Sequence, residues 1–215
     1  VSPIIIPCSL YLPPSISRME QLSEKDDFDR AIELIYGSDC NVYEKLFGSL
    51  QNAKQILPYL LNDPASKCYK KHYHFFRKKE KIIAIAALYD IEDFSWDINT
   101  DLMKKAFGNA GIELPESFDK AVTLLKNTFN NYHGKSFCYL DDVCVLEGER
   151  RRRIGSSMIM YLIKLAESQG KAVRLSVQSN NLIARQMYAN LGFVATTKEV
   201  SEISNALEYI QMVRI

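Results

Sequence analysis

The stretch Leu140–Phe193, LDDVCVLEGERRRRIGSSMIMYLIKLAESQGKAVRLSVQSNNLIARQMYANLGF, decides the fold. The apolar alternation at Val143 and Val145 predicts a strand that ends in a turn, and the turn holds the arginine run Arg150–Arg153 and Gly155. A long amphipathic helix follows, and then a second strand and a second helix. Free N–H groups and the helix dipole make a helix start behind such a turn a binding site for an anion.

The composition is that of an ordinary globular protein, with 215 residues, 47% hydrophobic and 25% charged. A chain of this length buries a substantial core, and we predict one domain over residues 15–215. Residues 1–14 are apolar, interrupted by prolines and without a basic N-terminal region, so they match a signal peptide poorly. We interpret them as an N-terminal extension or a vector-derived segment.

Charge and cysteine content exclude several classes of protein. The net charge of +1 argues against a general polyanion-binding protein. Five scattered cysteines without a CxxC pair favour reduced thiols in a cytoplasmic protein over a disulfide frame or a zinc site. His72 and His74 share one face of a predicted strand, but no third ligand accompanies them, so no metal is expected. No apolar run is long enough to span a membrane.

The first part of the chain predicts two helices. Ser23 and Asp26 can both cap the first helix, which Gly37 should end. The second helix is predicted over residues 43–61, and Pro58 should kink it or end it early.

A β-hairpin is predicted next, with strands over residues 69–77 and 81–89, the second buried on both faces. Residues 90–135 form an insert, which is either a helical insertion or a lid over a site. Its two helical pieces are expected near 100–109 and 115–131. Two strands, over 194–200 and 206–213, are expected to close the sheet as an antiparallel pair.

Two motifs within Leu140–Phe193 resemble those of the GNAT superfamily of acyl-CoA-dependent N-acetyltransferases. The family's phosphate-binding motif, R/Q-x-x-G-x-G/A after V-x-V-x-P, is matched at Arg150 and Gly155, whereas Arg153 stands at its middle glycine and Glu147 at its proline. The second motif, N-x-x-A-x-x-x-Y-x-x-x-G-F, is complete. It is filled by Asn181, Ala184, Tyr188, Gly192 and Phe193. Together the motifs are specific, and the resemblance extends from residue 15 to the C-terminus, weakest across the insert.

The resemblance implies a mixed α/β fold, with a mostly antiparallel central sheet flanked by helices and a V-shaped splay between the two central strands. It also implies acetyl-CoA as acyl donor, with the pyrophosphate on the backbone of the turn and the pantetheine amides on the splayed strand. The residues implied to bind the coenzyme are Val143, Cys144, Val145, Arg150, Arg151, Arg152, Arg153, Ile154, Gly155, Ser156, Asn181, Ala184 and Tyr188.

Four adjacent arginine side chains cannot all face one ligand. We therefore expect the backbone N–H groups of the turn to make most of the contacts with the phosphates. Gly155 lets that backbone approach a phosphate closely. If the turn requires a positive φ at Arg153, where the family has glycine, an arginine there costs about 1 kcal/mol.

Tyr188 is implied to be the general acid that protonates the leaving thiolate. A phenol suits this role because its pKa, about 10, lies close to that of a thiol. The alternative for Tyr188 is an aromatic residue of the core.

The general base stays open between Asp141, Asp142 and Glu147, with a slight preference for Glu147 over Asp142. Strand alternation predicts that Asp141 shares a face with Val143 while Asp142 points to the opposite face. Cys138 and Cys144 are expected to be inert core thiols, since direct acyl transfer needs no enzyme nucleophile.

We therefore predict direct transfer of an acetyl group from acetyl-CoA to a primary amine, with the thioester carbonyl polarised by a backbone N–H near Val145. The acceptor, a small molecule or a peptide or protein amine, should lie between the N-terminal helices, the insert and the closing strands. Acidic residues in the insert fit a cationic amine and fit a solvated loop equally well. They are Glu92, Asp93, Asp97 and Asp101.

Two other functions stay open on the sequence alone. One is a catalytically inactive acyl-CoA-binding sensor or scaffold. The other is a nucleic-acid-binding protein that uses Arg150–Arg153, which the second motif makes the weaker alternative. The sequence does not decide between a monomer and a homodimer, although a dimer is common in the family.

Overall fold

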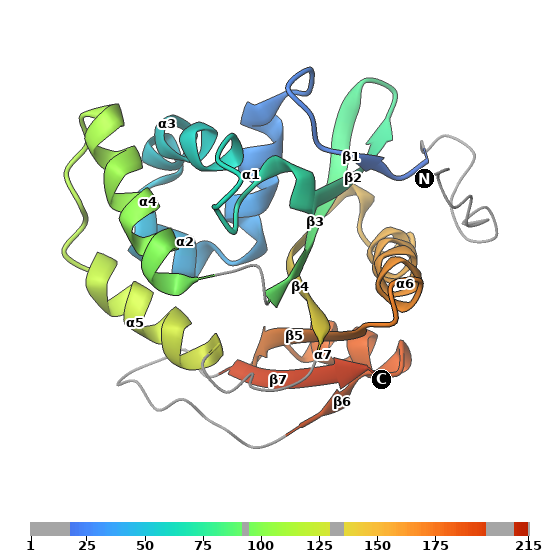
Figure 1. The fold of residues 1–215 in the computed structure, drawn as a ribbon. Helices are drawn as coiled ribbons and strands as arrows, with labels where there is room; N and C mark the ends of the chain where they lie inside the picture. Colours follow the sequence, from blue (N-terminus) through green and yellow to red (C-terminus); the bar gives the residue numbers. More distant parts are fainter. Residues whose placement is uncertain (1–17, 92–94, 130–135, 197–208, 215) are drawn as a thin grey trace.

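The computed structural model describes residues 18–91, 95–129, 136–196 and 209–214. They form a seven-stranded sheet in the order β1-β2-β3-β4-β5-β7-β6, in which only β4 and β5 are parallel neighbours (Figure 1). The strands are β1 Glu20–Gln21, β2 Tyr73–Lys78, β3 Lys81–Asp90, β4 Phe137–Val145, β5 Ala172–Gln178, β6 Val194–Ala195 and β7 Tyr209–Arg214. The predicted mixed, mostly antiparallel α/β fold is confirmed.

Helices cover both faces of the sheet, with α1 to α5 on one side and α6 on the other (Figure 1). They are α1 Phe28–Ser38, α2 Cys40–Phe47, α3 Leu50–Leu61, α4 Trp96–Ala110, α5 Phe118–Phe129, α6 Ile154–Glu167 and α7 Leu182–Asn190. Along β3, Ile85 packs into the core under α1 to α5, whereas Ala86 packs into the core under α6. This strand is buried on both faces, as its continuous apolar sequence predicts.

The start of α1 differs from the prediction. Asp27 is the N-cap, and its carboxylate accepts the N–H of Arg30 at 3.0 Å. Ser23 and Asp26, the expected caps, instead bond to each other in the preceding turn, where the Asp26 carboxylate accepts the hydroxyl of Ser23 at 2.7 Å. The helix also continues through Gly37, so the position of the glycine did not mark its end.

Two helices, α2 and α3, occupy the region predicted as one. The break falls at Gly48, whose φ of +77° is open to glycine at little steric cost. Ser49 then caps α3, accepting the N–H of Asn52 at 3.1 Å. Pro58 lies inside α3 and does not end it early.

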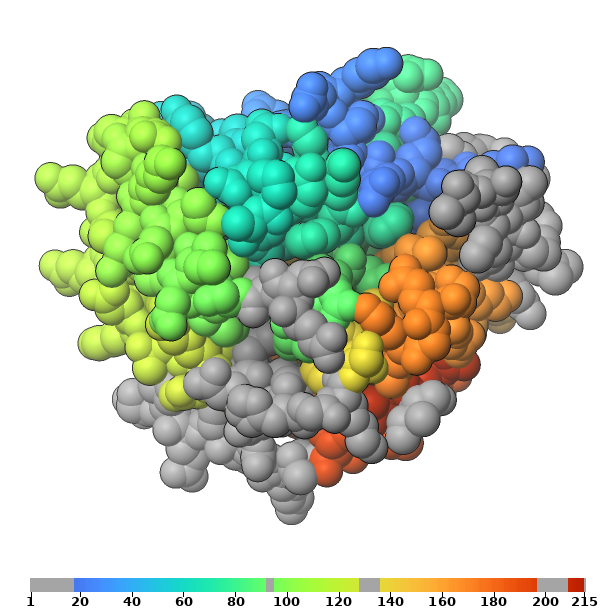
Figure 2. Space-filling view, viewed as in Figure 1, coloured from blue at the N-terminus to red at the C-terminus, as the bar shows by residue number. Residues whose placement is uncertain are grey.

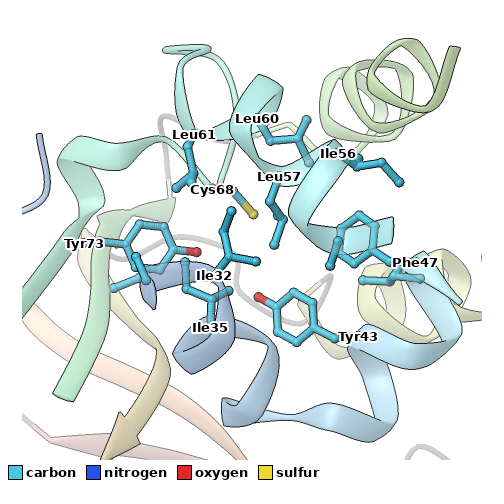
Figure 3. Packing of buried hydrophobic residues seen from close by; sticks show 14 of the residues in the cluster. Ile32, Ile35, Tyr43, Phe47, Ile56, Leu57, Leu60, Leu61, Cys68 and Tyr73 are labelled. Carbon is cyan, nitrogen blue, oxygen red and sulfur yellow. The ribbon is translucent and has the colours of Figure 1, made fainter. Parts of the chain in front are cut away.

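The predicted hairpin of β2 and β3 is confirmed, with its turn at Lys79, φ +53°. Its first strand is shorter than expected, because the 3-10 turn η1 (Lys70–His72) precedes β2. The residues around this turn matter for the site, since the chain just before it carries Lys67 and Cys68. Figure 3 shows Cys68 and Tyr73 packed against side chains of α1 and α3.

The insert is part of the core. The ring of Phe107 in α4 stacks on Phe47 in α2 with centroids 6.0 Å apart, and Phe118 in α5 meets Phe107 edge-on at 5.8 Å. Both predicted helices are present, and together they form a wall beside the N-terminal helices.

Some predictions fall on residues outside the described ranges, namely the N-terminal extension, Glu92, Asp93, His133 and the ends of the two closing strands. Within the described part, β6 and β7 pair antiparallel as expected. No helix in the described ranges combines the length and the apolar composition needed to cross a membrane.

Candidate active site

The strands β4 and β5 separate at the centre of the sheet. They pair only over Phe137–Tyr139 and Ala172–Arg174. A cavity of about 290 Å³ lies where they part, lined by residues 140–143 of β4 and 176–178 of β5. The V-shaped splay implied by the resemblance is therefore present. In the space-filling view, yellow atoms in the colour of β4 show at the surface beside α6 in orange (Figure 2).

A β-bulge interrupts β4 where it leaves β5. Asp141 pairs with Ala87 and Cys144 with Ile85, so two residues of β4 stand against one of β3 between these pairs. Asp142, within the bulge, has a left-handed φ of +51°. The extra residue reverses the alternation of side chains along the rest of the strand.

The bulge places two carboxylates on one face, and the predicted alternation of Asp141 and Asp142 is wrong. Both point towards the core under α1 to α5, where Asp141 meets Tyr89 and Asp142 meets Tyr43. Val143, which was expected to share the face of Asp141, packs on the α6 side. Simple alternation fails here because it assumes an uninterrupted ladder.

The Asp142 carboxylate is buried and accepts hydrogen bonds from three hydroxyl groups. One carboxylate oxygen accepts from Ser38 at 3.0 Å and from Tyr43 at 2.6 Å, and the other accepts from Tyr73 at 2.7 Å. The hydroxyls of Tyr43 and Tyr73 point inward from opposite sides of the cluster (Figure 3). Burial, and then repulsion from Asp141, raise the pKa of Asp142 to about 6, against the lowering effect of Lys67 and the tyrosine hydroxyls.

Asp141 forms an ion pair with Lys67, whose Nζ lies 2.7 Å from the Asp141 carboxylate. The Tyr89 hydroxyl donates to the same oxygen at 3.1 Å. Burial alone would lower the pKa of Lys67, but attraction to Asp141 and Asp142 outweighs it and raises that pKa. Lys67 is therefore held as an ammonium group in the cavity wall.

A third carboxylate, Asp39, lies at the corner between α1 and α2. It caps α2 by accepting the N–H of Val42 at 3.2 Å. It also accepts the side-chain amide of Gln178 in β5 at 2.8 Å and the hydroxyl of Tyr209 in β7. Asp39 thus ties the N-terminal helices to the far arm of the splay, on the wall of the cavity.

The turn before α6 presents its backbone to solvent. Arg151 and Arg153 both have a left-handed φ of +61°. In the described part of the chain, none of the backbone N–H groups from Arg151 to Ser156, Ile154 included, donates to an acceptor. Arg153, at the position where the family has glycine, therefore adopts the left-handed conformation that glycine favours.

The arginine side chains of this turn serve different contacts. Nε of Arg150 donates to the Val145 carbonyl at 3.0 Å, and Arg152 pairs with Glu149 at 3.2 Å. All four side chains are exposed. The free backbone donors, rather than a cluster of guanidinium groups, are the distinctive feature of this turn.

Gly155 lies where α6, β4 and α7 converge. A Cβ at this position would stand 3.4 Å from Cγ2 of Val145 and 3.7 Å from Sδ of Met187, which is ordinary contact. A groove between Ser156 of α6 and α7 continues along the surface from this point, lined by the exposed side chains of Leu182 and Ile183.

Three residues of the second motif, Asn181, Ala184 and Tyr188, line the cavity. Asn181 caps α7 by accepting the N–H of Ala184 at 3.1 Å. Tyr188 is buried one turn further along, edge-on to Phe193 with centroids 5.7 Å apart. Its hydroxyl forms no hydrogen bond with any described residue. Burial, and then the charge of Asp141, raise the pKa of Tyr188 above its ordinary value, so the phenol keeps its proton.

The other predicted residues are not all brought to the cavity. Glu147 is exposed in the 3-10 turn η3 (Glu147–Glu149) and does not line the cavity. Cys144 points to the opposite side of β4 from Val145, and its thiol lies against Gly37 of α1. Cys144 and Cys138 are buried, and burial raises the pKa of both thiols.

The sequence carried little signal for several wall residues, chiefly Asp39, Tyr43, Lys67 and Tyr209. Asp39 and Tyr43 belong to α2 and its cap, Lys67 and Tyr209 to two other segments, and none of the four belongs to a motif. Asp39 could have been recognised as a helix cap, but its position on the cavity depends on the tertiary fold. Within the described residues no group of three histidine, cysteine or acidic side chains is arranged to hold a metal.

Comparisons with known proteins bear on the family and the fold of this chain. Residues 41–193 match the family model described as Acetyltransferase (GNAT) family. A search of curated proteins finds no match.

Among solved structures, an acetyltransferase is 22% identical, with 92% of this chain and 98% of that chain covered and a TM-score of 0.65. An N-acetyltransferase from Staphylococcus aureus is 15% identical, with 92% and 100% covered and a TM-score of 0.61. A chain of the NatC complex bound to Gag peptide and CoA is 11% identical, with 93% and 97% covered and a TM-score of 0.55. At sequence identities this low, the structural similarity shows a shared fold and nothing more specific.

Proposed function

Because this chain belongs to the GNAT acetyltransferase family, we propose that it transfers an acetyl group from acetyl-CoA directly to the nitrogen of a primary amine. The observation that carries this proposal is the cavity at the splay, which joins the free edge of β4 to Tyr188 and to the buried carboxylate of Asp142. Family membership supports acetyl transfer, and a structural neighbour with the same fold binds CoA.

The coenzyme's pyrophosphate fits the turn before α6. The backbone N–H groups from Arg151 to Ser156 have no acceptor within the described residues, and several convergent donors are what a phosphate needs. Gly155 adds no side chain over these donors. Arg151 and Arg153 contribute long-range attraction from solvent, whereas Arg150 holds the end of β4 through the Val145 carbonyl.

The pantetheine arm fits along β4. From Leu140 onward the strand has no partner strand on the side of β5, which leaves this edge open to an extended ligand with amide groups. Side chains already bond two backbone groups here, because the Asp142 N–H donates to Asp141 and the Val145 carbonyl accepts from Arg150. Val143 borders the cavity, and the exposed face of α7 with Ala184 lies on the other side. The thioester, when bound here, supplies the electrophilic carbonyl, and a β4 backbone N–H near Val145 polarises it.

In the transfer step we assign Asp142 as the base and Tyr188 as the acid. The amine nitrogen bonds to the carbonyl carbon and the carbon–sulfur bond breaks. The amine proton passes to Asp142, directly or through the hydroxyl of Ser38 or Tyr43, and the Tyr188 proton passes to sulfur. Asp142 replaces Glu147 as the preferred base because Asp142 lines the cavity and Glu147 does not.

The two pKa shifts suit these roles. With a pKa of about 6, Asp142 is mostly ionised at neutral pH and is a stronger base than an ordinary carboxylate. Tyr188, with its pKa raised by burial, remains protonated until the thiolate leaves.

The test is release of free CoA thiol from acetyl-CoA over a panel of amines, with acetyl-CoA binding measured by calorimetry in parallel. The proposal predicts binding and amine-dependent thiol release. Binding without turnover of any amine would instead favour the sensor or scaffold function. Steeply salt-dependent binding to DNA or RNA, lost in Arg151→Ala and Arg152→Ala, would favour the nucleic-acid function.

A further inference from the structure

We propose that the acceptor is a small primary amine with one positive charge and an apolar, aromatic or aliphatic body. This inference rests on the proposed function and concerns the half of the cavity formed by α1, α2, α4 and α5. The evidence for it is the arrangement of the charged side chains in the cavity wall and the apolar side chains that surround them.

The cavity wall holds four charged side chains, Asp39, Lys67, Asp141 and Asp142. Lys67 and Asp141 neutralise each other in a 2.7 Å ion pair. The remaining negative charge belongs to Asp39, at the start of α2, and to Asp142, on β4, and both residues line the cavity.

Both of these carboxylates have room for one more donor. Asp39 accepts three hydrogen bonds within the protein, from Val42, Gln178 and Tyr209. Asp142 also accepts three, from three hydroxyl groups. Because an ionised carboxylate offers about four acceptor positions, each can still bind an ammonium N–H. An incoming cationic amine can thus be held by Asp39 while its ammonium proton leaves to solvent, and the neutral amine then gives one N–H proton to Asp142 during transfer.

Apart from the polar groups of Asn41, Ser66 and Asn99, the rest of this half of the cavity is mainly apolar. Side chains from four different elements line it, and none of them carries a charge. They are Phe47, Trp96, Met103, Leu125 and Tyr139. A second ammonium group would lose its hydration against these side chains without gaining a carboxylate partner. An aromatic or aliphatic body instead gains from burial against the same side chains.

The size of the cavity limits the acceptor further. Its volume of about 290 Å³ is shared between the acceptor and the reacting end of the donor. Pockets for drug-sized ligands are roughly 300–1,000 Å³. A polypeptide segment or an aminoglycoside would therefore extend beyond this cavity, whereas a small amine fits within it.

Two pairs of variants test the recognition. Asp39→Asn removes the charge but keeps a residue that caps helices equally well, so α2 should stay folded. We expect its KM for a monoamine to rise about tenfold or more, as for loss of a charge-assisted hydrogen bond, with acetyl-CoA affinity unchanged. Asp97→Asn, a surface residue paired with Lys126 outside the cavity, is the matched control.

Trp96→Gln should raise KM for phenethylamine and tryptamine while leaving KM for ethylamine unchanged, because ethylamine has no body to contact residue 96. Trp96→Phe keeps a smaller aromatic wall and should raise KM for phenethylamine and tryptamine less than Trp96→Gln does. Equal effects of the two substitutions would overturn the assignment of this wall to the acceptor.

The deciding experiment compares kcat/KM for phenethylamine, tryptamine and hexylamine with values for spermidine, glucosamine and a lysine-containing peptide. We expect the three apolar monoamines to be preferred by at least tenfold. Preference for spermidine, glucosamine or the peptide would overturn the inference and leave the proposed function standing. Acetyl-CoA binding with no turnover of any amine would contradict the proposed function, and the inference with it.

Discussion

The coenzyme side and the acceptor side of the cavity are built in different ways. The coenzyme side comes from one continuous stretch, residues 140–193, and offers mainly backbone groups. The acceptor side is made of side chains such as Asp39, Lys67 and Trp96, which come from separate segments and meet only in the fold. Backbone recognition tolerates a change of side chain, as Arg153 illustrates, whereas side-chain recognition changes with each substitution.

The largest effect is expected from Gly155→Glu on the coenzyme side. A carboxylate over the free N–H groups of the turn would occupy and repel the phosphate site, so acetyl-CoA affinity should fall by about a hundredfold or more, equivalent to roughly 2.7 kcal/mol. Calorimetry measures the affinity, and circular dichroism checks the fold. Gly155→Ala is the control, since its Cβ would make only ordinary contact with Val145 at 3.4 Å. Unchanged affinity in the glutamate variant would mean that the phosphate site is elsewhere.

Tyr188→Phe should slow catalysis without affecting the coenzyme. Loss of a general acid lowers kcat by about 10² to 10⁴-fold, while the affinity for acetyl-CoA should change little because the ring remains. Steady-state kinetics and calorimetry separate the two quantities. A full rate in the phenylalanine variant would make Tyr188 an aromatic residue of the core only.

The pH dependence should reveal Asp142, which belongs to the acceptor side although it lies on β4. Because the base must be ionised, kcat/KM should fall as the pH drops through about 6. Asp142→Asn should lower kcat/KM by about a hundredfold and flatten this profile. Tyr73→Phe should move the midpoint to higher pH, since the Tyr73 hydroxyl donates to the ionised carboxylate at 2.7 Å. An unchanged midpoint in Tyr73→Phe would separate the profile from Asp142.

The raised pKa of Asp142 also predicts how the stability of the fold depends on pH. The folded pKa of Asp142, about 6, lies above its ordinary value of 3.8, so the folded state binds this proton more tightly than the unfolded state. The resulting stability is fully present below about pH 4 and is lost as the pH rises through about 6. Thermal unfolding of the Asp142→Asn variant between pH 4 and 7 should lack this contribution. An identical pH dependence in both proteins would contradict the assignment.

The smallest effect is expected from Arg153→Gly. Releasing a left-handed arginine should stabilise the protein by about 1 kcal/mol, which is a rise in Tm of roughly 2–4 °C. Acetyl-CoA affinity should hardly change, because the backbone donors stay in place. Arg152→Gly is the control, since it removes an arginine whose φ is not positive, and it should not raise Tm. A large loss of affinity in Arg153→Gly would assign the phosphate contact to the side chain instead.

Where the sequence predicted the structure well, the signal was local. Regular apolar patterns identified the hairpin β2–β3, both helices of the insert and the β-α-β-α unit, and the motif around Asn181 placed Tyr188 on the cavity. Predictions failed where a single residue changed the chain's course. Gly48 splits the one expected helix into two, and the bulge at Asp142 reverses the faces to which the side chains of β4 point after it.

The sequence by itself determined the fold class, the family and the coenzyme turn, because these depend on residues close together in the chain and on the backbone between Arg150 and Gly155. Only the tertiary structure decided which carboxylates share the cavity. A left-handed residue inside a strand moves Asp142 beside Asp141, and long-range packing brings Asp39 and Lys67 to the same wall. No periodicity encodes such contacts, since each depends on the packing of segments that lie far apart in the chain.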